Sequence, residues 1–239
     1  MAQHAYVLEE SRLSLLRGFT FQDADLPLAA QRLVAFLALQ ERPVRRDYVA
    51  GRLWPEASET RAHGALRTTI WRVARVAPEA LWVAGPHLAL SGHVVVDVHE
   101  TTALARSVIA GAHGTDHRDL SFAGDLLPDW YDDWVVFERE RLRQLRLHAL
   151  EILCDARVRA GRFAEGVVAG LAAVAGDPLR ESAHRVLISA YLAQANASDA
   201  LRQYDLYRRH LAEALGLAPS PRMRALLASV HEPPVSRAG

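Results

Sequence analysis

The sequence contains no lysine, a single cysteine and no long uninterrupted apolar run. All 28 basic residues are therefore arginines, which excludes the phosphate-binding glycine loop that ends in lysine. Cys154 can form neither an internal disulfide nor a metal site made only of thiolates, so its solitary presence favours a reducing cytoplasm. No segment reaches the roughly 18 apolar residues that a membrane span needs, and we expect no membrane contact.

The arginines and acids are unevenly placed along a chain whose formal net charge is zero. Residues 42–75 hold eight arginines against Asp47, Glu56 and Glu59, whereas residues 121–140 hold six acids against one arginine. An arginine-rich helix pair indicates a polyanion partner, because guanidinium groups match phosphate and guanine in geometry. A merely solvated helix face is the alternative interpretation.

Residues 1–96 carry the signals of one domain that mixes short strands with three helices. In chain order, the patterns predict a small sheet over residues 12–28, a core helix over 29–40, a second helix over 45–54, a third that ends near Ala77, a hairpin over 81–90 and a strand over 94–96. Pro55 stops the second helix, in which Tyr48, Val49 and Leu53 are expected to face inward. This order of elements is that of a winged helix.

The third helix has two distinct faces. Leu66, Ile70, Val73 and Ala77 recur at spacings of four, three and four, which predicts one buried stripe. The remaining face is polar and carries Arg61, His63, Arg67, Thr68, Trp71, Arg72 and Arg75. An α-helix fits the major groove of DNA, so this face is the natural candidate for reading a base sequence.

From Asp97 onward the sequence is almost entirely helical, and we predict a second domain over residues 97–230 with a disordered tail over 231–239. Sliding this half by 34 residues aligns residues 147–180 with 181–214. The matched positions are Ala149, Leu153, Gly161, Phe163, Ala173 and Pro178 in the first copy and Ala183, Leu187, Tyr191, Ala200 and Tyr204 in the second. Such hairpins must stack to bury their apolar faces, which predicts an all-α tetratricopeptide-like domain completed by helices near 97–111, 130–146 and 217–230.

Several motifs together resemble the small Streptomyces antibiotic regulatory protein type, over about residues 10–230. They are LSLLRGF at 13–19, QRLVAFLAL at 31–39, the run from Val44 to Pro55, ALRTTIWRV at 65–73, VDV at 96–98, GDLLPDWYDDW at 124–134 and DPLRESAH at 177–184. The resemblance implies an OmpR-type winged helix followed by a bacterial transcriptional activator domain. It further implies an activator that binds direct repeats in duplex promoter DNA, as a homodimer, and recruits RNA polymerase through its σ and α subunits.

Within the winged helix, three groups of residues are the candidate DNA contacts. Arg67, Thr68, Trp71 and Arg72 are expected to read bases, since arginine donates twice to guanine. The expected phosphate contacts are Arg45, Arg46, Arg52, Arg61 and Arg75. His87 is the candidate wing contact. All of these residues lie in 1–96, so this fragment is expected to bind DNA by itself.

Two other functions remain open in the sequence. The first is an interaction adaptor whose repeats bind a partner helix or peptide while the winged helix no longer reads DNA. The second is a repressor that uses the same DNA-binding residues. No enzyme is predicted, because no nucleophile motif is present, and no cofactor is expected. His113 and His117 lack a clear third ligand, so no metal site is predicted.

Overall fold

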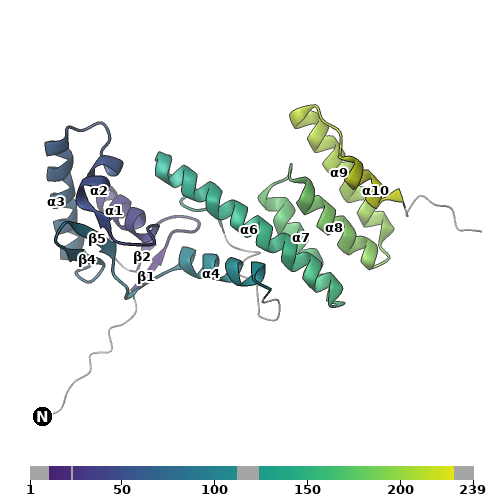
Figure 1. Cartoon of the computed structure of the whole chain (residues 1–239), viewed down its shortest axis with the longest axis horizontal. Helices are drawn as coiled ribbons and strands as arrows, with labels where there is room; N and C mark the ends of the chain where they lie inside the picture. The colour runs from purple at the N-terminus through teal and green to yellow at the C-terminus, as the bar shows by residue number, and fades with distance from the viewer. Residues whose placement is uncertain (1–10, 23, 112–123, 229–239) are drawn as a thin grey trace, which may run out of the picture. The chain divides into compact units, whose positions relative to one another are not determined.

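A computed structural model of the chain describes residues 11–22, 24–111 and 124–228. It divides into two compact units: unit 1 is Met1–Thr101 with Gly124–Leu142, and unit 2 is Thr102–Ala123 with Arg143–Gly239. The predicted fold class is confirmed, because the chain is mainly helical and the strands among its described residues all precede residue 97 (Figure 1). None of the helices in the described part of the chain is both long and apolar enough to cross a membrane.

Unit 1 contains two small sheets. The first has the order β2 (Thr20–Phe21), β1 (Ser11–Ser14), β6 (Val94–Val96), and the second has the order β3 (Val44–Arg45), β5 (His87–Leu90), β4 (Leu81–Ala84). β4 and β5 form the predicted hairpin, and Gly85 in its turn has φ 55°, which glycine adopts without a Cβ clash. Asp97, which follows β6, ties that strand to the end of β1. Its carboxylate accepts hydrogen bonds from the backbone N–H groups of Leu15 and Leu16 at 3.0–3.1 Å.

Three helices of unit 1 surround one core: α1 (Leu28–Ala38), α2 (Arg46–Leu53) and α3 (Glu59–Val76). α1 is buried over most of its length, as its nearly continuous apolar sequence requires. The predicted stripe of α3 faces inward, with Leu66 and Val73 at most 1% exposed and Ile70 half-buried. Thr69 also lies on this side, where its hydroxyl donates to the carbonyl of Ala65 at 2.8 Å.

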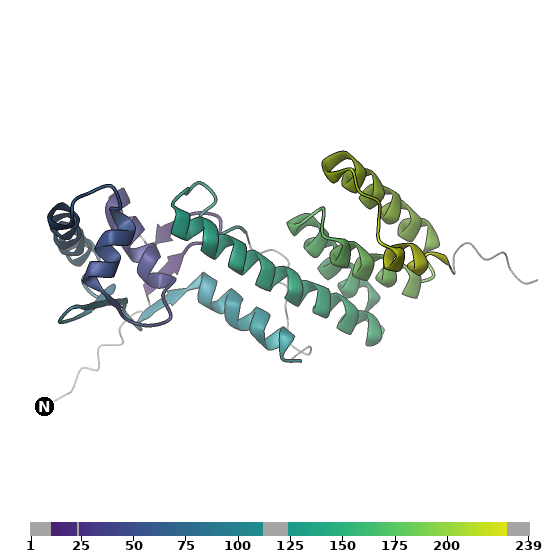
Figure 2. The ribbon, with the colours of Figure 1, turned by 45° about the horizontal axis from the view of Figure 1, so that its top comes forward.

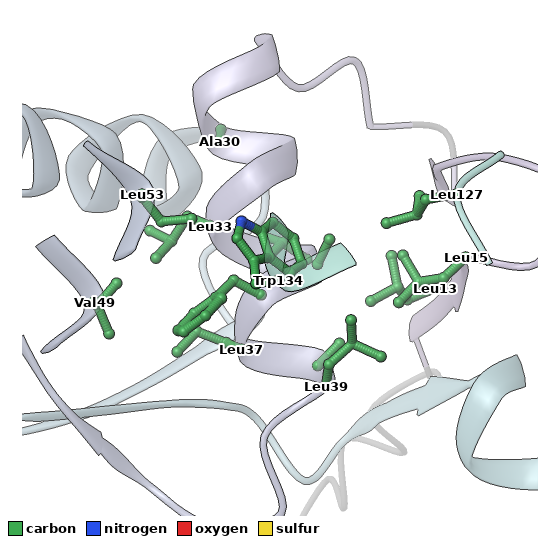
Figure 3. Close-up of a cluster of buried hydrophobic side chains, with 14 of the residues drawn as sticks. Leu13, Leu15, Ala30, Leu33, Leu37, Leu39, Val49, Leu53, Leu127 and Trp134 are labelled. Carbon is green, nitrogen blue, oxygen red and sulfur yellow. The ribbon is translucent and has the colours of Figure 1, made fainter. Parts of the chain in front are cut away.

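Residues 124–142 complete the core of unit 1, although they are distant from it in sequence. Leu126 forms an antiparallel bridge with Leu16, and the N–H of Leu127 donates to the carbonyl of Leu15 at 2.9 Å. Trp134 packs edge-on against Phe36, with ring centroids 5.3 Å apart. Figure 3 shows Trp134 and Leu127 in the same cluster of side chains as the leucines of β1 and α1.

Unit 2 consists of stacked helical hairpins. α4 (Asp97–Ile109) and α6 (Asp133–Arg159) each begin in unit 1 and end in unit 2, where α7 (Phe163–Gly176), α8 (Glu181–Ala193), α9 (Ala197–Leu215) and α10 (Pro221–Leu226) follow. Figures 1 and 2 show α7 beside α8 and α8 beside α9, the arrangement that a 34-residue helical repeat predicts. Gly170 permits the close approach of α7 and α8, because a Cβ there would lie 3.1 Å from Leu187.

The turns of the two repeats have the same backbone conformation despite different residues. Gly161, between α6 and α7, has φ 73°. Ala195, 34 residues later and between α8 and α9, has φ 58°. An L-residue in the left-handed region costs roughly 1–2 kcal/mol. The second repeat therefore retains the turn geometry without the glycine that suits it, and Asn196 begins α9 by accepting the N–H of Asp199.

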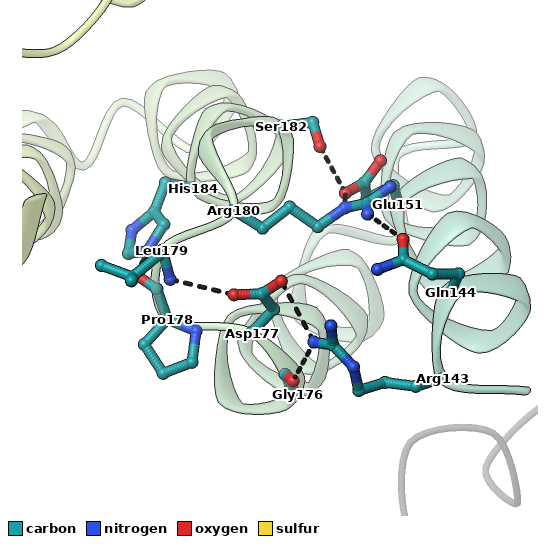
Figure 4. Close-up of polar contacts among 10 residues, drawn as sticks. All are labelled: Arg143, Gln144, Glu151, Gly176, Asp177, Pro178, Leu179, Arg180, Ser182 and His184. Carbon is teal, nitrogen blue, oxygen red and sulfur yellow. Dashed lines mark hydrogen bonds and ion pairs between the residues drawn. The ribbon is translucent and has the colours of Figure 1, made fainter. Parts of the chain in front are cut away.

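Charged side chains fasten α6 to the turn between α7 and α8 (Figure 4). Arg180 donates to the carboxylate of Glu151 at 2.5 Å, and the hydroxyl of Ser182 donates to the same oxygen at 2.6 Å. Arg143 donates to Asp177 at 3.1 Å and to the carbonyl of Gly176 at 3.2 Å. The DPLRESAH motif thus supplies the residues that bind α6 to the turn between the two repeats.

A second polar cluster joins α8 to the start of α10. Glu181 accepts hydrogen bonds from the backbone N–H and the hydroxyl of Ser220 and from the hydroxyl of Tyr207. The neighbouring His184 is fully buried and packs against the ring of Tyr207, with 4.4 Å between ring centroids. Burial lowers the pKa of His184, which keeps its ring neutral beside the carbonyl of Pro178.

The structure differs from the sequence predictions at four points. Tyr48 is 49% exposed, because it lies at the edge of the core beside Phe36 and not within it. Arg45 lies in β3, which pairs with the hairpin, and not in the second helix. The helix expected over 130–146 is α6 and continues to Arg159. The contacts assign residues 124–142 to unit 1, whereas the predicted domains placed them in the second half. The expected disordered tail lies outside the described residues, as do His113 and His117.

Candidate nucleic-acid interface

α2 and α3 form a helix pair whose connection is held locally. Trp54 ends α2, and Pro55 cannot continue it. α3 then begins after Ser58, whose hydroxyl accepts the Nε–H of Arg61 at 3.2 Å. The two helices pack against each other, and Val49, Leu53 and Leu66 are each at most 1% exposed. This packing fixes which side of α3 remains open to solvent.

The open side of α3 carries all four residues predicted to read bases. Arg67, Thr68, Trp71 and Arg72 are exposed, and Trp71 has 57% of its surface accessible. The hydroxyl of Thr68 donates to the carbonyl of Gly64 within the helix at 3.1 Å. The guanidinium of Arg75 lies 4.9 Å from the centre of the Trp71 ring, a cation–π distance.

Arg67 and Arg72 have no hydrogen bond or ion pair among the described residues. Each guanidinium therefore keeps its donors for water or a ligand. Gly64 lies on the same side of α3, and a Cβ built there would have no atom within 4 Å. Gly64 was not among the predicted DNA contacts, although its spacing of three and four from Arg67 and Thr68 puts it on that face.

The hairpin of β4 and β5 lies beside the start of α2. Arg45 of β3 pairs directly with His87 of β5, so a predicted phosphate contact and the predicted wing contact are brought together. The backbone N–H of Arg46 donates to the carbonyl of Pro86 in the hairpin turn at 2.8 Å. Since the hairpin is tied to the first turn of α2, we call β3, β4 and β5 the wing.

The predicted phosphate contacts differ in how available their charges are. Arg52 is exposed and has no ion-pair partner in the part of the chain that the structure describes. Arg45 forms an ion pair with Asp47 at 3.2 Å, where both side chains are largely exposed. Arg46 is only half-exposed, and its buried Nε–H has no partner among the described residues. Arg61 and Arg75 lie on the open side of α3.

Arg42, which precedes β3, is a further candidate that the sequence analysis did not single out. It is exposed and has no ion-pair partner within the described residues. With Arg45, Tyr48 and His87 it lines a hollow of about 760 Å³ in unit 1. The local excess of arginine could have identified it, because Arg42 begins the arginine-rich stretch.

The chain is similar to known regulatory proteins. The family model described as the bacterial transcriptional activator domain matches residues 98–231. The regulatory protein AfsR of Streptomyces coelicolor is 29% identical over 210 residues, covering 81% of this chain and 21% of AfsR. The transcriptional regulatory protein EmbR of Mycobacterium tuberculosis is 28% identical over 230 residues, covering 87% of this chain and 59% of EmbR.

A solved structure has a similar fold. It is Mycobacterium tuberculosis EmbR in complex with a low-affinity phosphopeptide, with a TM-score of 0.68 and 25% identity, and the match covers 91% of this chain and 64% of that one. The chain thus spans 21% of the length of AfsR and 59% of that of EmbR.

Proposed function

The chain belongs to the bacterial transcriptional activator domain family, and from this membership we propose that it activates transcription by binding promoter DNA through α3 and the wing. The membership confirms the resemblance to the Streptomyces antibiotic regulatory protein type, and both relatives carry the names of regulatory proteins. Its site of action would be the bacterial cytoplasm.

The observation that carries the DNA-binding proposal is the unpaired charge on the open side of α3. Arg67 and Arg72 present donors that no described carboxylate neutralises. DNA phosphates would satisfy such donors, and the release of condensed counterions would favour binding. The merely solvated face that the sequence left open accounts less well for two unpaired arginines beside an exposed Trp71.

Each group of residues has a distinct proposed task. Arg67, Thr68, Trp71 and Arg72 would contact base edges in the major groove. Arg45, Arg52, Arg61 and Arg75 would hold phosphates, with a smaller part for the half-buried Arg46. His87, opposite Arg45, would contact the backbone or minor groove from the wing.

The test is the salt dependence of DNA binding by the full chain. We expect the chain to bind DNA from its own promoter region with an affinity that falls steeply between low and physiological salt. A plot of the logarithm of the binding constant against the logarithm of the salt concentration should have a slope of about −0.9 for each phosphate that is neutralised. Random DNA of equal length should bind more weakly, with a similar slope. An adaptor whose winged helix does not read DNA would show no binding even in dilute buffer, and that result would contradict the proposal.

For the helical half we propose recruitment of RNA polymerase through its σ and α subunits, by two protomers on direct repeats. Exposed positions of unit 2 should then include some where substitution abolishes transcription by purified polymerase while promoter occupancy is unchanged. If transcription follows occupancy at every position, recruitment by this half is wrong. If bound protein lowers transcription, the chain is a repressor that uses the same DNA contacts.

A further inference from the structure

Unit 2 contains a groove of about 550 Å³ between three helices, which we call the α6–α8–α10 groove. Its floor is apolar, with one residue from each helix: Ile152, Val186 and Leu226, all half-buried. Because α6, α8 and α10 contribute one face each, the groove continues across the stacked hairpins. An extended or helical segment of a partner could lie along such a path.

The two carboxylates in the lining already have partners. Glu151 is only 8% exposed and is bound by Arg180 and Ser182, as Figure 4 shows. Asp155 pairs with Arg159 one turn further along α6, at 2.5 Å. Neither carboxylate therefore presents an uncompensated negative charge to a ligand in the groove.

The two arginines in the lining are different. Arg222 of α10 is exposed and forms no hydrogen bond or ion pair among the described residues. Arg185 of α8 forms no ion pair within 4 Å among the described residues, although its charge contributes to the lowered pKa of Glu181. That carboxylate already accepts hydrogen bonds from Ser220 and Tyr207. The groove thus presents two guanidinium groups with open donors beside an apolar floor.

We propose that the α6–α8–α10 groove binds a short acidic segment of a partner protein, in which aspartate or glutamate side chains alternate with apolar ones. The carboxylates would pair with Arg185 and Arg222, and the apolar side chains would cover Ile152, Val186 and Leu226. Charge-assisted hydrogen bonds in a partly enclosed site contribute more than those on an open surface. All of these residues belong to unit 2, so this proposal does not depend on whether α3 binds DNA.

The experiment uses the full chain as bait for a phage-displayed library of random dodecapeptides. We expect enriched sequences to combine acidic and apolar residues. A synthetic copy of one enriched peptide, measured by fluorescence anisotropy, should bind at least about tenfold more weakly to Arg185→Gln and to Arg222→Gln, the loss expected for one charge-assisted bond. Binding should also weaken as salt is raised.

Arg209→Gln is the matched control, because Arg209 is an exposed arginine on α9 and does not line the groove. It should bind the peptide like the wild-type chain, and all three variants should unfold at similar temperatures. The proposal is overturned if no sequence is enriched, if the enriched sequences lack acids, or if both groove variants bind normally. Self-association that both groove variants abolish would also overturn it, since a second copy would then occupy the groove.

Discussion

Arg67 and Arg72 differ from the other arginines of unit 1 in lying unpaired on the open side of α3. We predict that Arg67→Ala and Arg72→Ala each reduce discrimination between the operator and random DNA by about 1–3 kcal/mol. Arg52→Ala, a change at an exposed arginine of α2, should reduce the affinity for the operator and for random DNA by the same factor. Competition binding at fixed salt measures the difference. Equal losses on both DNAs for all three variants would remove the distinction between base-reading and phosphate-holding residues.

The α3 face was predictable at the level of single residues because helical spacing alone separates it from the buried stripe of Leu66 and Val73. The exposure of Tyr48 and the half-burial of Arg46 were not predictable in this way. Both lie next to β3 and the wing, whose contacts are made by residues some 40 positions later in the sequence. Local periodicity contains no information about such contacts.

His184 and Glu181 make the folding of unit 2 sensitive to acid. Burial lowers the pKa of His184. Burial of Glu181 acts to raise its pKa, but the hydrogen bonds from Ser220 and Tyr207, together with the charge of Arg185, outweigh it and lower the pKa overall. In each case the unfolded chain takes up its proton at a higher pH than the folded chain, so the stabilisation is full at neutral pH and is lost as the pH falls.

We therefore predict that the unfolding temperature of the full chain falls first as pH drops below the ordinary histidine range near 6.5, and again below about 4.3 as Glu181 becomes involved. His184→Gln should lower the unfolding temperature at pH 7.5, but the further fall in unfolding temperature below about pH 6.5 should be smaller than in the wild-type chain. His93→Gln, a change at an exposed histidine of unit 1, should leave the pH profile unaltered. An unchanged slope in His184→Gln would show that this ring does not govern the acid response.

At the scale of elements, the turn between α8 and α9 offers a direct gain in stability. Ala195 has φ 58°, which glycine adopts without steric cost. We predict that Ala195→Gly raises the free energy of unfolding by up to about 1 kcal/mol. The relief of backbone strain in the left-handed region is partly offset by the greater entropy of glycine in the unfolded chain. The reciprocal change Gly161→Ala, in the corresponding turn of the first repeat, should lower it by a similar amount. Urea unfolding measures both, and a destabilised Ala195→Gly would contradict the repeat correspondence.

The ends of helices and strands were predictable from the sequence only where a turn or helix-breaking residue marks them. The hairpin and α3 were predicted well, because Gly85 marks the turn of the hairpin and Pro78 marks the end of α3. α6 extends past the predicted end because no glycine or proline interrupts residues 133–159. β3 has two residues, too few for an alternating pattern, and only its pairing with β5 defines it.

At the scale of the whole molecule, unit 1 is not continuous in sequence. A fragment of residues 1–96, which the sequence suggested would bind DNA by itself, lacks Leu126, Leu127 and Trp134 from the core. Losing Trp134 alone removes packing of a kind worth about 3–5 kcal/mol. We predict that fragment 1–96 unfolds without a cooperative transition and retains little DNA, whereas fragment 1–142 unfolds cooperatively and retains DNA with normal salt dependence. A well-folded, DNA-binding 1–96 fragment would refute this.

The discontinuity of unit 1 also has a genetic consequence. If the DNA-binding unit were continuous in sequence, a premature stop codon after it would leave a folded fragment able to compete with the intact protein for DNA. Here the chain must be translated as far as Leu142 before all of unit 1 exists. Nonsense alleles that end between Val96 and Gly124 should therefore be recessive, because their products lack residues 124–142, which complete the core, and cannot occupy the operator.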